Sequence, residues 1–365
     1  METLKAVKPT YDIALSYEEN YARGPFFDGP FPERVIEKKI RFLDFEVNSI
    51  VGIPAGPLLN ANWIRVYARL GFDLPVYKTV RTQARPSHPP PNCLFVDVKG
   101  QLTEKRFDKT LRSIEGDWKG PLEEISITNS FGMPSRDPRI WQEDVEKAKS
   151  YLEPGQILTV SVVGTVGEGD LMQDYARGAA LAREAGADIV EINLSCPNVS
   201  SGEGQLFTDP EYAGRLCKTV KKALHHTPLM IKIGYLTDDH VLNELAKHTA
   251  PSIQAVSGIN TLSFEVLTET GDPALPGKGR IRSGICGASI RECGIHQVSR
   301  LANIRQKEGY DFGLVGVGGI MRVEDIDRYV EAGADVVMSA TGAMWDPYLA
   351  YRYWQSRRKP PNPPG

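Results

Sequence analysis

A cysteine beside a proline, with an asparagine on either side, is the most reactive group that the sequence offers. In the segment 186–199 the largely β-branched residues 189–192 are typical of a short β-strand, and Asn193-Leu-Ser-Cys196-Pro-Asn198 follows directly. A thiol in this setting can accept a proton, while the two carboxamides act as fixed hydrogen-bond donors and acceptors. A lone cysteine is more often a small buried core residue. The interpretation therefore depends on what other segments bring beside Cys196.

Other apolar segments also end in polar residues or glycine. The strand ends predicted to carry such groups are those at Lys78, Asn129, Asn193, Lys232, Asn260, Gly318 and Thr341. For Lys78, an ordinary solvent-exposed position at a strand end is as good an interpretation as a role in a binding site. It is a weaker alternative for Lys232, which has apolar neighbours on both sides within 228–233.

Two late glycine segments, 316–319 and 340–342, predict a phosphate-binding site. Each lies at the end of one of the last two predicted strands, where backbone N–H groups and a helix N-terminus of a barrel point at an anion. One such segment alone is also compatible with an ordinary tight turn. Walker and opening G-x-G-x-x-G motifs are missing, which disfavours ATP and a Rossmann-bound nicotinamide. Two lysines opposite a phosphate site favour a phosphorylated cofactor that gains negative charge, such as a reduced flavin.

The elements that position these residues alternate between strand and helix about eight times, which is typical of a parallel (β/α)8 TIM barrel. The predicted strands are 49–56, 76–80, 125–129, 156–163, 189–192, 228–233, 253–259, 312–320 and 335–342. The predicted helices are 61–70, 141–152, 170–184, 210–224, 238–247, one from 288, 323–332 and 345–357. A doubly wound sheet is the alternative. The barrel is favoured because only closure brings seven such strand ends to one mouth.

The rest of the chain predicts additions to this barrel. Residues 1–45, rich in aromatic residues, proline and charge, indicate an N-terminal extension packed on a barrel that spans 46–358. Residues 92–124 look like a polar insertion with one weak strand pattern. The proline-rich residues 359–365 predict a disordered tail.

Composition narrows the class of protein. With 365 residues, 41% hydrophobic and 24% charged, and a net charge of −3, the chain matches an ordinary globular protein without a nucleic-acid partner. Five scattered cysteines without a C-x-x-C pair argue against iron–sulfur clusters, structural zinc or another metal site and for a reducing compartment. No segment resembles a signal peptide or a membrane span, so we expect a cytoplasmic protein.

Taken together, the motifs resemble the FMN-dependent dihydroorotate dehydrogenases over residues 48–355. The matching residues are Asn193-Leu-Ser-Cys196-Pro-Asn198, Lys78-Thr79, Asn129-Ser-Phe-Gly-Met-Pro134, Lys232, Asn260-Thr261, Gly318-Gly319 and Ala340-Thr341. The cysteine is similar to the soluble class of this family, since the membrane-bound class that uses quinone carries serine there. Two positions depart from the family: Cys286 stands where Ser or Gly is usual, and Glu292 stands where Pro is usual.

The resemblance implies that FMN lies across the barrel mouth and that Cys196 is the catalytic base, with Arg85 as a candidate for lowering its pKa. It places the FMN phosphate on Gly287, Gly318, Gly319, Ala340 and Thr341. It assigns the rest of the cofactor to Ala55, Gly56, Lys78, Thr79, Asn193 and Lys232. It assigns the substrate to Lys78, Asn129, Asn193, Asn198, Asn260 and Thr261, with the backbone of Phe131, Gly132 and Met133 on the substrate carboxylate.

The implied reaction is the oxidation of dihydroorotate to orotate in pyrimidine biosynthesis, with hydride passing to FMN and a proton to Cys196. Three alternatives remain. A reductase or dehydrogenase of another dihydropyrimidine shares the cysteine motif but lacks the 129–134 loop, and a tRNA dihydrouridine synthase is disfavoured by the net charge. A flavin-binding protein without turnover is the third. The sequence leaves the electron acceptor open, with fumarate or another soluble molecule as the simplest expectation, and a homodimer is compatible with the family.

Overall fold

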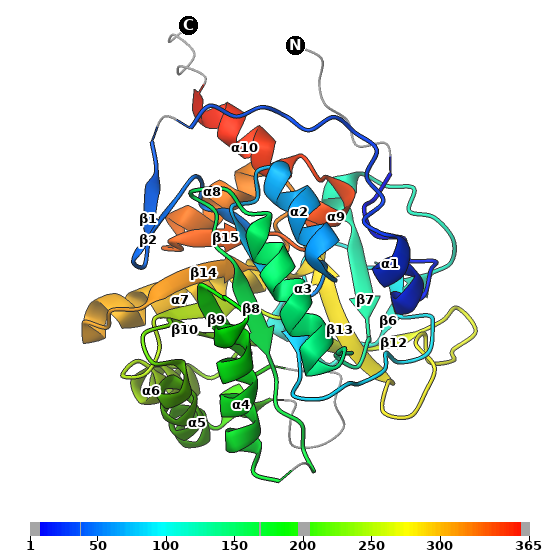
Figure 1. Ribbon diagram of the computed structural model, residues 1–365. Coiled ribbons are helices and arrows are strands. Elements are labelled where there is room, and N and C mark those ends of the chain that lie inside the picture. The colour runs from blue at the N-terminus through cyan, green and yellow to red at the C-terminus, as the bar shows by residue number, and fades with distance from the viewer. Residues whose placement is uncertain (1–7, 37, 168, 196–204, 359–365) are drawn as a thin grey trace, which may run out of the picture.

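Eight parallel strands close into a barrel in the computed structural model of the chain (Figure 1). The structure describes residues 8–36, 38–167, 169–195 and 205–358. Around the barrel the strands are β3 (Val51–Ile53), β4 (Leu74–Val80), β8 (Thr159–Val162), β9 (Ile189–Asn193), β10 (Leu229–Ile233), β11 (Ala255–Gly258), β14 (Gly313–Val317) and β15 (Val336–Met338). The predicted (β/α)8 barrel is therefore confirmed, and the doubly wound sheet is excluded.

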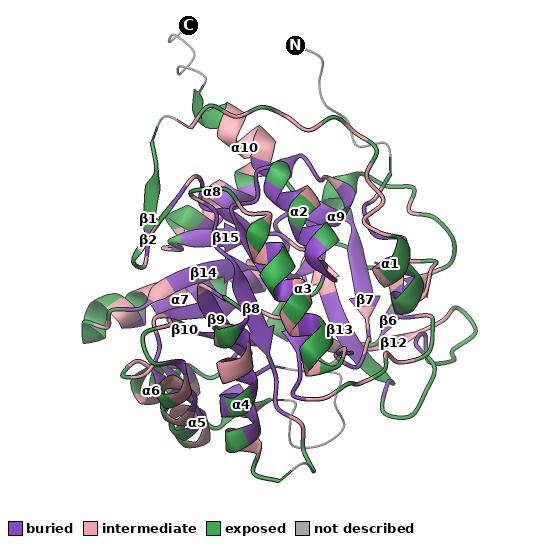
Figure 2. Ribbon diagram, in the orientation of Figure 1, coloured by how far each residue is buried: buried purple, intermediate pink, exposed green. Residues whose placement is uncertain are grey.

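Helices follow the barrel strands and cover their outer side. They are α2 (Ala61–Arg69), α3 (Pro138–Ser150), α4 (Leu171–Glu184), α5 (Pro210–Leu224), α6 (Asp239–Thr249), α7 (Arg291–Glu308), α8 (Val323–Glu331), α9 (Thr341–Trp345) and α10 (Leu349–Arg358). Each of α4, α5 and α6 is preceded by an N-cap aspartate (Asp170, Asp209 and Asp238) whose side chain accepts a backbone N–H of the first turn, which satisfies a donor that has no partner within the helix. Figure 2 shows the barrel strands buried and the outer helix faces exposed.

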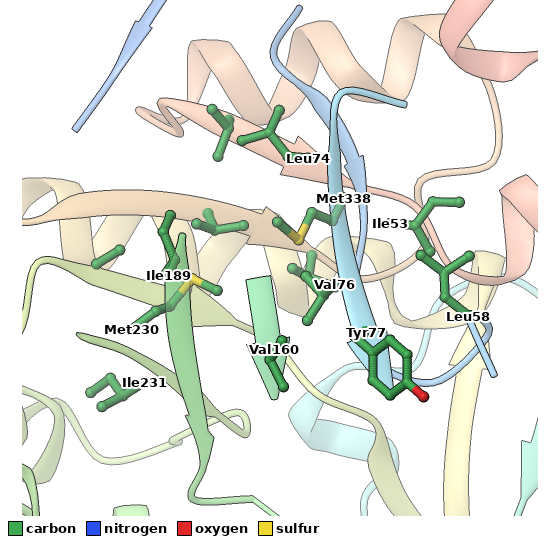
Figure 3. Packing of buried hydrophobic residues seen from close by; sticks show 14 of the residues in the cluster. Ile53, Leu58, Leu74, Val76, Tyr77, Val160, Ile189, Met230, Ile231 and Met338 are labelled. Carbon is green, nitrogen blue, oxygen red and sulfur yellow. The ribbon is translucent and has the colours of Figure 1, made fainter. Parts of the chain in front are cut away.

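The barrel interior is apolar at one end and polar at the other. Side chains alternate along a strand, so Ile189, Glu191 and Asn193 share one face of β9, while Met230 and Lys232 share one face of β10. Figure 3 shows Ile189 and Met230 among the buried apolar side chains of the cluster. The first residues of these strands therefore pack in the apolar core, and the last residues place polar groups at the carboxyl end of the barrel.

A second, smaller barrel of five strands lies beside the first (Figure 1). Its strands are β5 (Cys93–Asp97), β6 (Leu111–Ile114), β7 (Ser126–Asn129), β12 (Leu262–Leu267) and β13 (Arg282–Gly287). It has its own apolar core, in which the rings of Phe107 and Phe264 meet edge to face with centroids 6.0 Å apart. Short one-turn helices η1 (Glu104–Arg106), η2 (Leu122–Glu124), η3 (Leu206–Thr208) and η4 (Ala288–Ile290) complete the connections.

This small barrel corrects two predictions. The prediction that Asn129 ends a strand of the main barrel was wrong, because β7 pairs antiparallel with β13 and β5 of the small barrel. Residues 92–124 contribute two strands, where the sequence predicted only one weak strand in a polar insertion. A short buried run such as 125–129 looks the same in a parallel or an antiparallel sheet, so the sequence did not distinguish its partners.

The described N-terminal residues contact the main barrel from outside. The helix α1 (Tyr17–Arg23) lies beside β7 in Figure 1, and the antiparallel pair β1 (Ile40–Phe42) and β2 (Phe45–Val47) follows. The backbone N–H of Thr10 donates to the carbonyl of Met344 in α9 at 2.9 Å. Among the described residues, no helix is both long and apolar enough to span a bilayer.

Candidate active site

A pocket of about 1320 Å³, counted with its open mouth, lies where the carboxyl ends of the main barrel strands meet the small barrel. It is lined by every predicted site residue that the structure describes: Ala55, Gly56, Lys78, Thr79, Asn129, Phe131, Gly132, Met133, Asn193, Lys232, Asn260, Thr261, Gly287, Gly318, Gly319, Ala340 and Thr341. The predicted Cys196 and Asn198 lie outside the described residues. Residues from distant parts of the chain are thus brought together at one mouth.

Hydrogen bonds from two asparagine side chains and one tyrosine hydroxyl fix the end of β9. The Asn193 side chain accepts the backbone N–H of Ser195 at 3.0 Å, and the Asn260 side-chain amide donates to the Ser195 carbonyl. The Tyr175 hydroxyl on α4 donates to the Asn193 carbonyl at 2.8 Å. Ser195 itself lines the pocket and directly precedes Cys196 in the chain. These hydrogen bonds fix the backbone at the point where the cysteine motif begins.

Lys78 is buried at the end of β4. Its ammonium donates to the carbonyl of Thr79 at 2.7 Å and to that of Pro134. Burial lowers the pKa of Lys78 to about 7, with repulsion from Arg81 and Arg136 acting in the same direction and Glu18 opposing them. Lys78 can therefore change its protonation near neutral pH.

Lys232 and Glu191 form a second buried charged group beneath the pocket. Lys232 donates to the Ala55 carbonyl at 3.3 Å. Glu191 is fully buried, and its carboxylate has no well-formed hydrogen bond within the described part of the chain. Burial raises the pKa of Glu191, which Lys232 partly counteracts, and burial lowers the pKa of Lys232, which Glu191 partly counteracts. The two side chains lie on the neighbouring strands β9 and β10, where Glu191 pairs with the residue two positions before Lys232, so each moderates the other's charge.

The two predicted phosphate segments form a tight cradle of backbone. Gly318 and Gly319 have positive φ angles of 123° and 69°. A Cβ on Gly319 would lie 2.6 Å from the backbone nitrogen of Arg291, so only glycine fits there. The backbone N–H groups of Gly318, Gly319, Ala340 and Thr341 find no acceptor within the described residues, which leaves them free for an anion.

The loop after β7 forms the opposite wall. The Asn129 side-chain amide donates to the Cys286 sulfur at 3.3 Å, and burial raises the pKa of the Cys286 thiol. The buried Arg280 guanidinium donates to the carbonyls of Pro89, Pro91, Pro276 and Ser130. Four carbonyls on one guanidinium rigidly tie the loop to its neighbours.

Gly132 and Thr261 add two details to this wall. Gly132 has a φ of 77°, and a Cβ there would lie 2.6 Å from the imidazole of His88. The Thr261 hydroxyl is buried without a partner among the described residues. A ligand or water in the pocket can supply a hydrogen bond to this hydroxyl.

Sequence reasoning missed several residues that line the pocket. Tyr11 and Tyr17 come from the N-terminal segment, and Cys93 comes from β5. The aromatic composition of residues 1–45 was a signal, but it does not say which surface the rings cover. Arg85 is not among the lining residues; its backbone pairs with Ser135, and its proposed influence on Cys196 stays a prediction.

The fold and the pocket define a barrel enzyme whose ligands bind at the carboxyl ends of the strands, as in other proteins of this architecture. A family model described as dihydroorotate dehydrogenase matches residues 121–353. Because this match covers more than half of the sequence, the chain belongs to the dihydroorotate dehydrogenase family.

Comparison with known proteins gives the same family. The chain is 39% identical over 365 residues to a dihydroorotate dehydrogenase of Dictyostelium discoideum, covering 96% of this chain and 98% of that protein. It is 32% identical over 258 residues to the catalytic subunit of an NAD(+)-type dihydroorotate dehydrogenase B of Shouchella clausii, covering 69% and 76%. A crystal structure of the Eimeria tenella enzyme with ferulenol, 17% identical, shares the fold with a TM-score of 0.67, covering 86% of this chain and 81% of that one.

Proposed function

We propose that the protein oxidises dihydroorotate to orotate with FMN, in pyrimidine biosynthesis. One observation carries this proposal: a single pocket is lined by all the described residues to which the family resemblance assigns flavin or substrate contacts. The retained loop 129–134 favours a substrate with a carboxylate over an uncharged dihydropyrimidine, because its backbone is fixed beside the pocket by Arg280. Family membership supports the same reaction.

The pocket fits FMN at two places. The free N–H groups of Gly318, Gly319, Ala340 and Thr341 suit the phosphate. At Gly56 an added Cβ would meet nothing within 4 Å, so the backbone there leaves room for a flat ring. When bound, FMN supplies a hydride acceptor. Lys232 would lie at the pyrimidine edge of the flavin. Its ammonium, whose charged form is favoured by the nearby Glu191, would compensate negative charge on the reduced flavin.

The remaining chemistry belongs to the chain's own residues. Oxidation of dihydroorotate removes a proton from the carbon next to a carbonyl, and we assign this proton to Cys196. The hydrogen bonds of Asn193 and Asn260 to Ser195 fix the backbone that leads into Cys196. Lys78, Asn129, Asn193, Asn260 and Thr261 would orient the substrate, together with Asn198 and the backbone of 131–133. A base positioned in this way contributes roughly 10²- to 10⁴-fold to the rate.

We also propose an electron acceptor, a location and an assembly for the enzyme. A soluble acceptor such as fumarate would reoxidise the flavin, the protein would act in the cytoplasm, and a homodimer is the assembly to test first. We also propose the chain division expected from the sequence: an extension 1–45, a flavin-binding barrel 46–358 and a tail 359–365. Reoxidation by fumarate, NAD(+) and a quinone, compared side by side, identifies the acceptor. Sedimentation of the purified protein gives its assembly.

Replacing Cys196 tests the mechanism. We expect Cys196→Ala to retain FMN, since the cradle is elsewhere, but to reduce the rate of flavin reduction by dihydroorotate by about two orders of magnitude or more. Stopped-flow absorbance under anaerobic conditions measures this rate. Cys217→Ala, a change on α5 away from the pocket, is the control and should leave the rate unchanged. Equal rates in the two variants would remove Cys196 from the mechanism.

A further inference from the structure

The N-terminal segment 8–31 contributes aromatic rings to the pocket wall. We propose that Tyr17 of this segment is a positioning residue of the active site, which holds Lys78 and the loop 129–134 in place for the substrate. This inference rests on the proposed function, in which Lys78 contacts the substrate. It adds a part of the chain that lies outside the family match at 121–353.

Tyr17 covers the side of Lys78 that the main barrel leaves open. Two carbonyls, those of Thr79 and Pro134, accept from the ammonium. The ring of Tyr17 lies with its centroid 5.7 Å from the same nitrogen, within the range of a cation–π contact. Tyr17 and Lys78 are 5% and 6% exposed, so the contact between them is buried. The position of Lys78 thus depends on a side chain from α1.

The same helix also contacts the loop after β7. The rings of Tyr17 and Phe131 meet at 6.1 Å and 63°, close to an edge-to-face pair. Glu18 forms an ion pair with Arg136, whose guanidinium lies 4.4 Å from the ring centroid of Tyr21. Phe131 lines the pocket, and Arg136 follows two residues after Pro134, which accepts from Lys78. Helix α1 therefore contacts the loop at Phe131 and the chain just after the loop at Arg136.

Local hydrogen bonds fix α1 in this orientation. Ser16 caps its first turn in a capping box with Glu19. The buried Asn20 side chain donates to the carbonyls of Asp12, Leu15 and Ser16, which folds the preceding turn onto the helix.

Contacts with the barrel anchor the segment on both sides of Tyr17. Asn60, the N-cap of α2, donates to the carbonyl of Tyr21 at 2.9 Å. Thr10 contacts the hydroxyl of Tyr67 at 2.5 Å and donates its backbone N–H to Met344. The ring of Tyr17 is accordingly held in place without a ligand, as a positioning residue requires.

The charges around Lys78 predict how the loss of this ring would act. Arg81 and Arg136 repel the ammonium, Glu18 attracts it, and burial is the largest cause of its lowered pKa of about 7. Replacing the Tyr17 ring by an aliphatic side chain removes the cation–π stabilisation of the ammonium and keeps the site apolar, which lowers the pKa of Lys78 further. It also frees the loop at Phe131, which weakens substrate binding more than it slows the chemical step.

Three variants of the purified full-length enzyme test this proposal. Tyr17→Leu removes the aromatic face and keeps an apolar side chain, while Tyr17→Phe keeps the face. Phe26→Leu makes the same change in the same segment at a residue that does not line the pocket. Acetylation of the Lys78 peptide, followed by mass spectrometry across pH 6 to 10, reports the titration of Lys78 without any turnover. Steady-state kinetics with dihydroorotate report KM and kcat.

We expect Tyr17→Leu to shift the midpoint of Lys78 acetylation to lower pH and to raise KM about tenfold, with a smaller change in kcat. Tyr17→Phe and Phe26→Leu should resemble the wild type in both measurements. An acetylation midpoint or a KM of Tyr17→Leu equal to that of the wild type would overturn the proposal. The two proposals can fail separately. If the midpoint shifts in Tyr17→Leu but even the wild-type protein does not oxidise dihydroorotate, the proposed function is contradicted and the contact of Tyr17 with Lys78 is still established.

Discussion

Lys78 shows the energetic cost of burying a charged side chain at the pocket. Its ammonium is buried against two carbonyls and an aromatic ring, and no carboxylate within the described residues forms a salt bridge with it. A buried unpaired charge is costly, which is why its pKa falls to about 7. A lysine kept at this cost is expected where a ligand supplies the missing negative charge.

The buried ammonium of Lys78 predicts how the stability of the flavin-free protein depends on pH. Lysine in an unfolded chain has a pKa of about 10.4, so between pH 7 and pH 10 the unfolded state binds more protons than the folded state and stability rises with pH. Below pH 7 both states are protonated, and the full cost is present. Lys78→Met has no such group. We expect the unfolding free energy of the wild type, relative to Lys78→Met, to increase by on the order of 3 kcal/mol from pH 7 to pH 10.

Urea unfolding of both proteins at several pH values measures this difference. Other titrating groups are common to the two proteins and cancel in the comparison. Parallel stability curves would mean that Lys78 titrates in the folded protein as it does in the unfolded chain.

At the scale of elements, the pocket depends on connections whose backbone admits only glycine. Gly319 and Gly309 both have positive φ angles, 69° and 67°, but their surroundings differ. A Cβ at Gly319 would collide with the backbone of Arg291, whereas a Cβ at Gly309 would meet nothing within 4 Å. The two positions therefore separate backbone strain from crowding of the cradle.

We expect Gly319→Ala to lose most of its bound FMN, because the collision displaces the backbone that would hold the phosphate. Gly309→Ala carries the same strain, about 1 kcal/mol, at the end of α7 and should keep its full flavin content. The ratio of flavin absorbance to protein absorbance in the purified variants measures the effect. Full flavin content in a folded Gly319→Ala protein would show that this glycine does not shape the phosphate site.

The elements of the main barrel could be predicted from the sequence, whereas the small barrel was represented only by the strand 125–129 and one weak strand pattern within 92–124. Segments such as 189–192 and 228–233 are β-branched or apolar and alternate with amphipathic helices, so local patterns identify them. The strands β5 and β6 are short, and they pair with β7 and β12, the latter more than 150 positions away from β6. Pairing over such separations leaves no periodic signal in the sequence.

For the whole molecule, the candidate site was more predictable than the elements that carry it. Asn129 was assigned to the wrong barrel and still lies in the pocket, because the small barrel delivers its strand end to the same mouth. Tyr11 and Tyr17 escaped prediction because an aromatic side chain in an irregular segment does not indicate what it covers. Motifs predicted residues that line the pocket, and only the three-dimensional structure located the N-terminal wall of the pocket.

The central claim is that one pocket between two barrels brings a flavin and dihydroorotate together. Anaerobic addition of dihydroorotate to the purified, FMN-loaded protein tests it most directly, with absorbance and product followed together. The account predicts loss of the oxidised flavin spectrum with one orotate formed per flavin, and no such loss with dihydrouracil, which lacks the carboxylate. A flavin that stays oxidised with dihydroorotate, or that dihydrouracil reduces equally well, would contradict it.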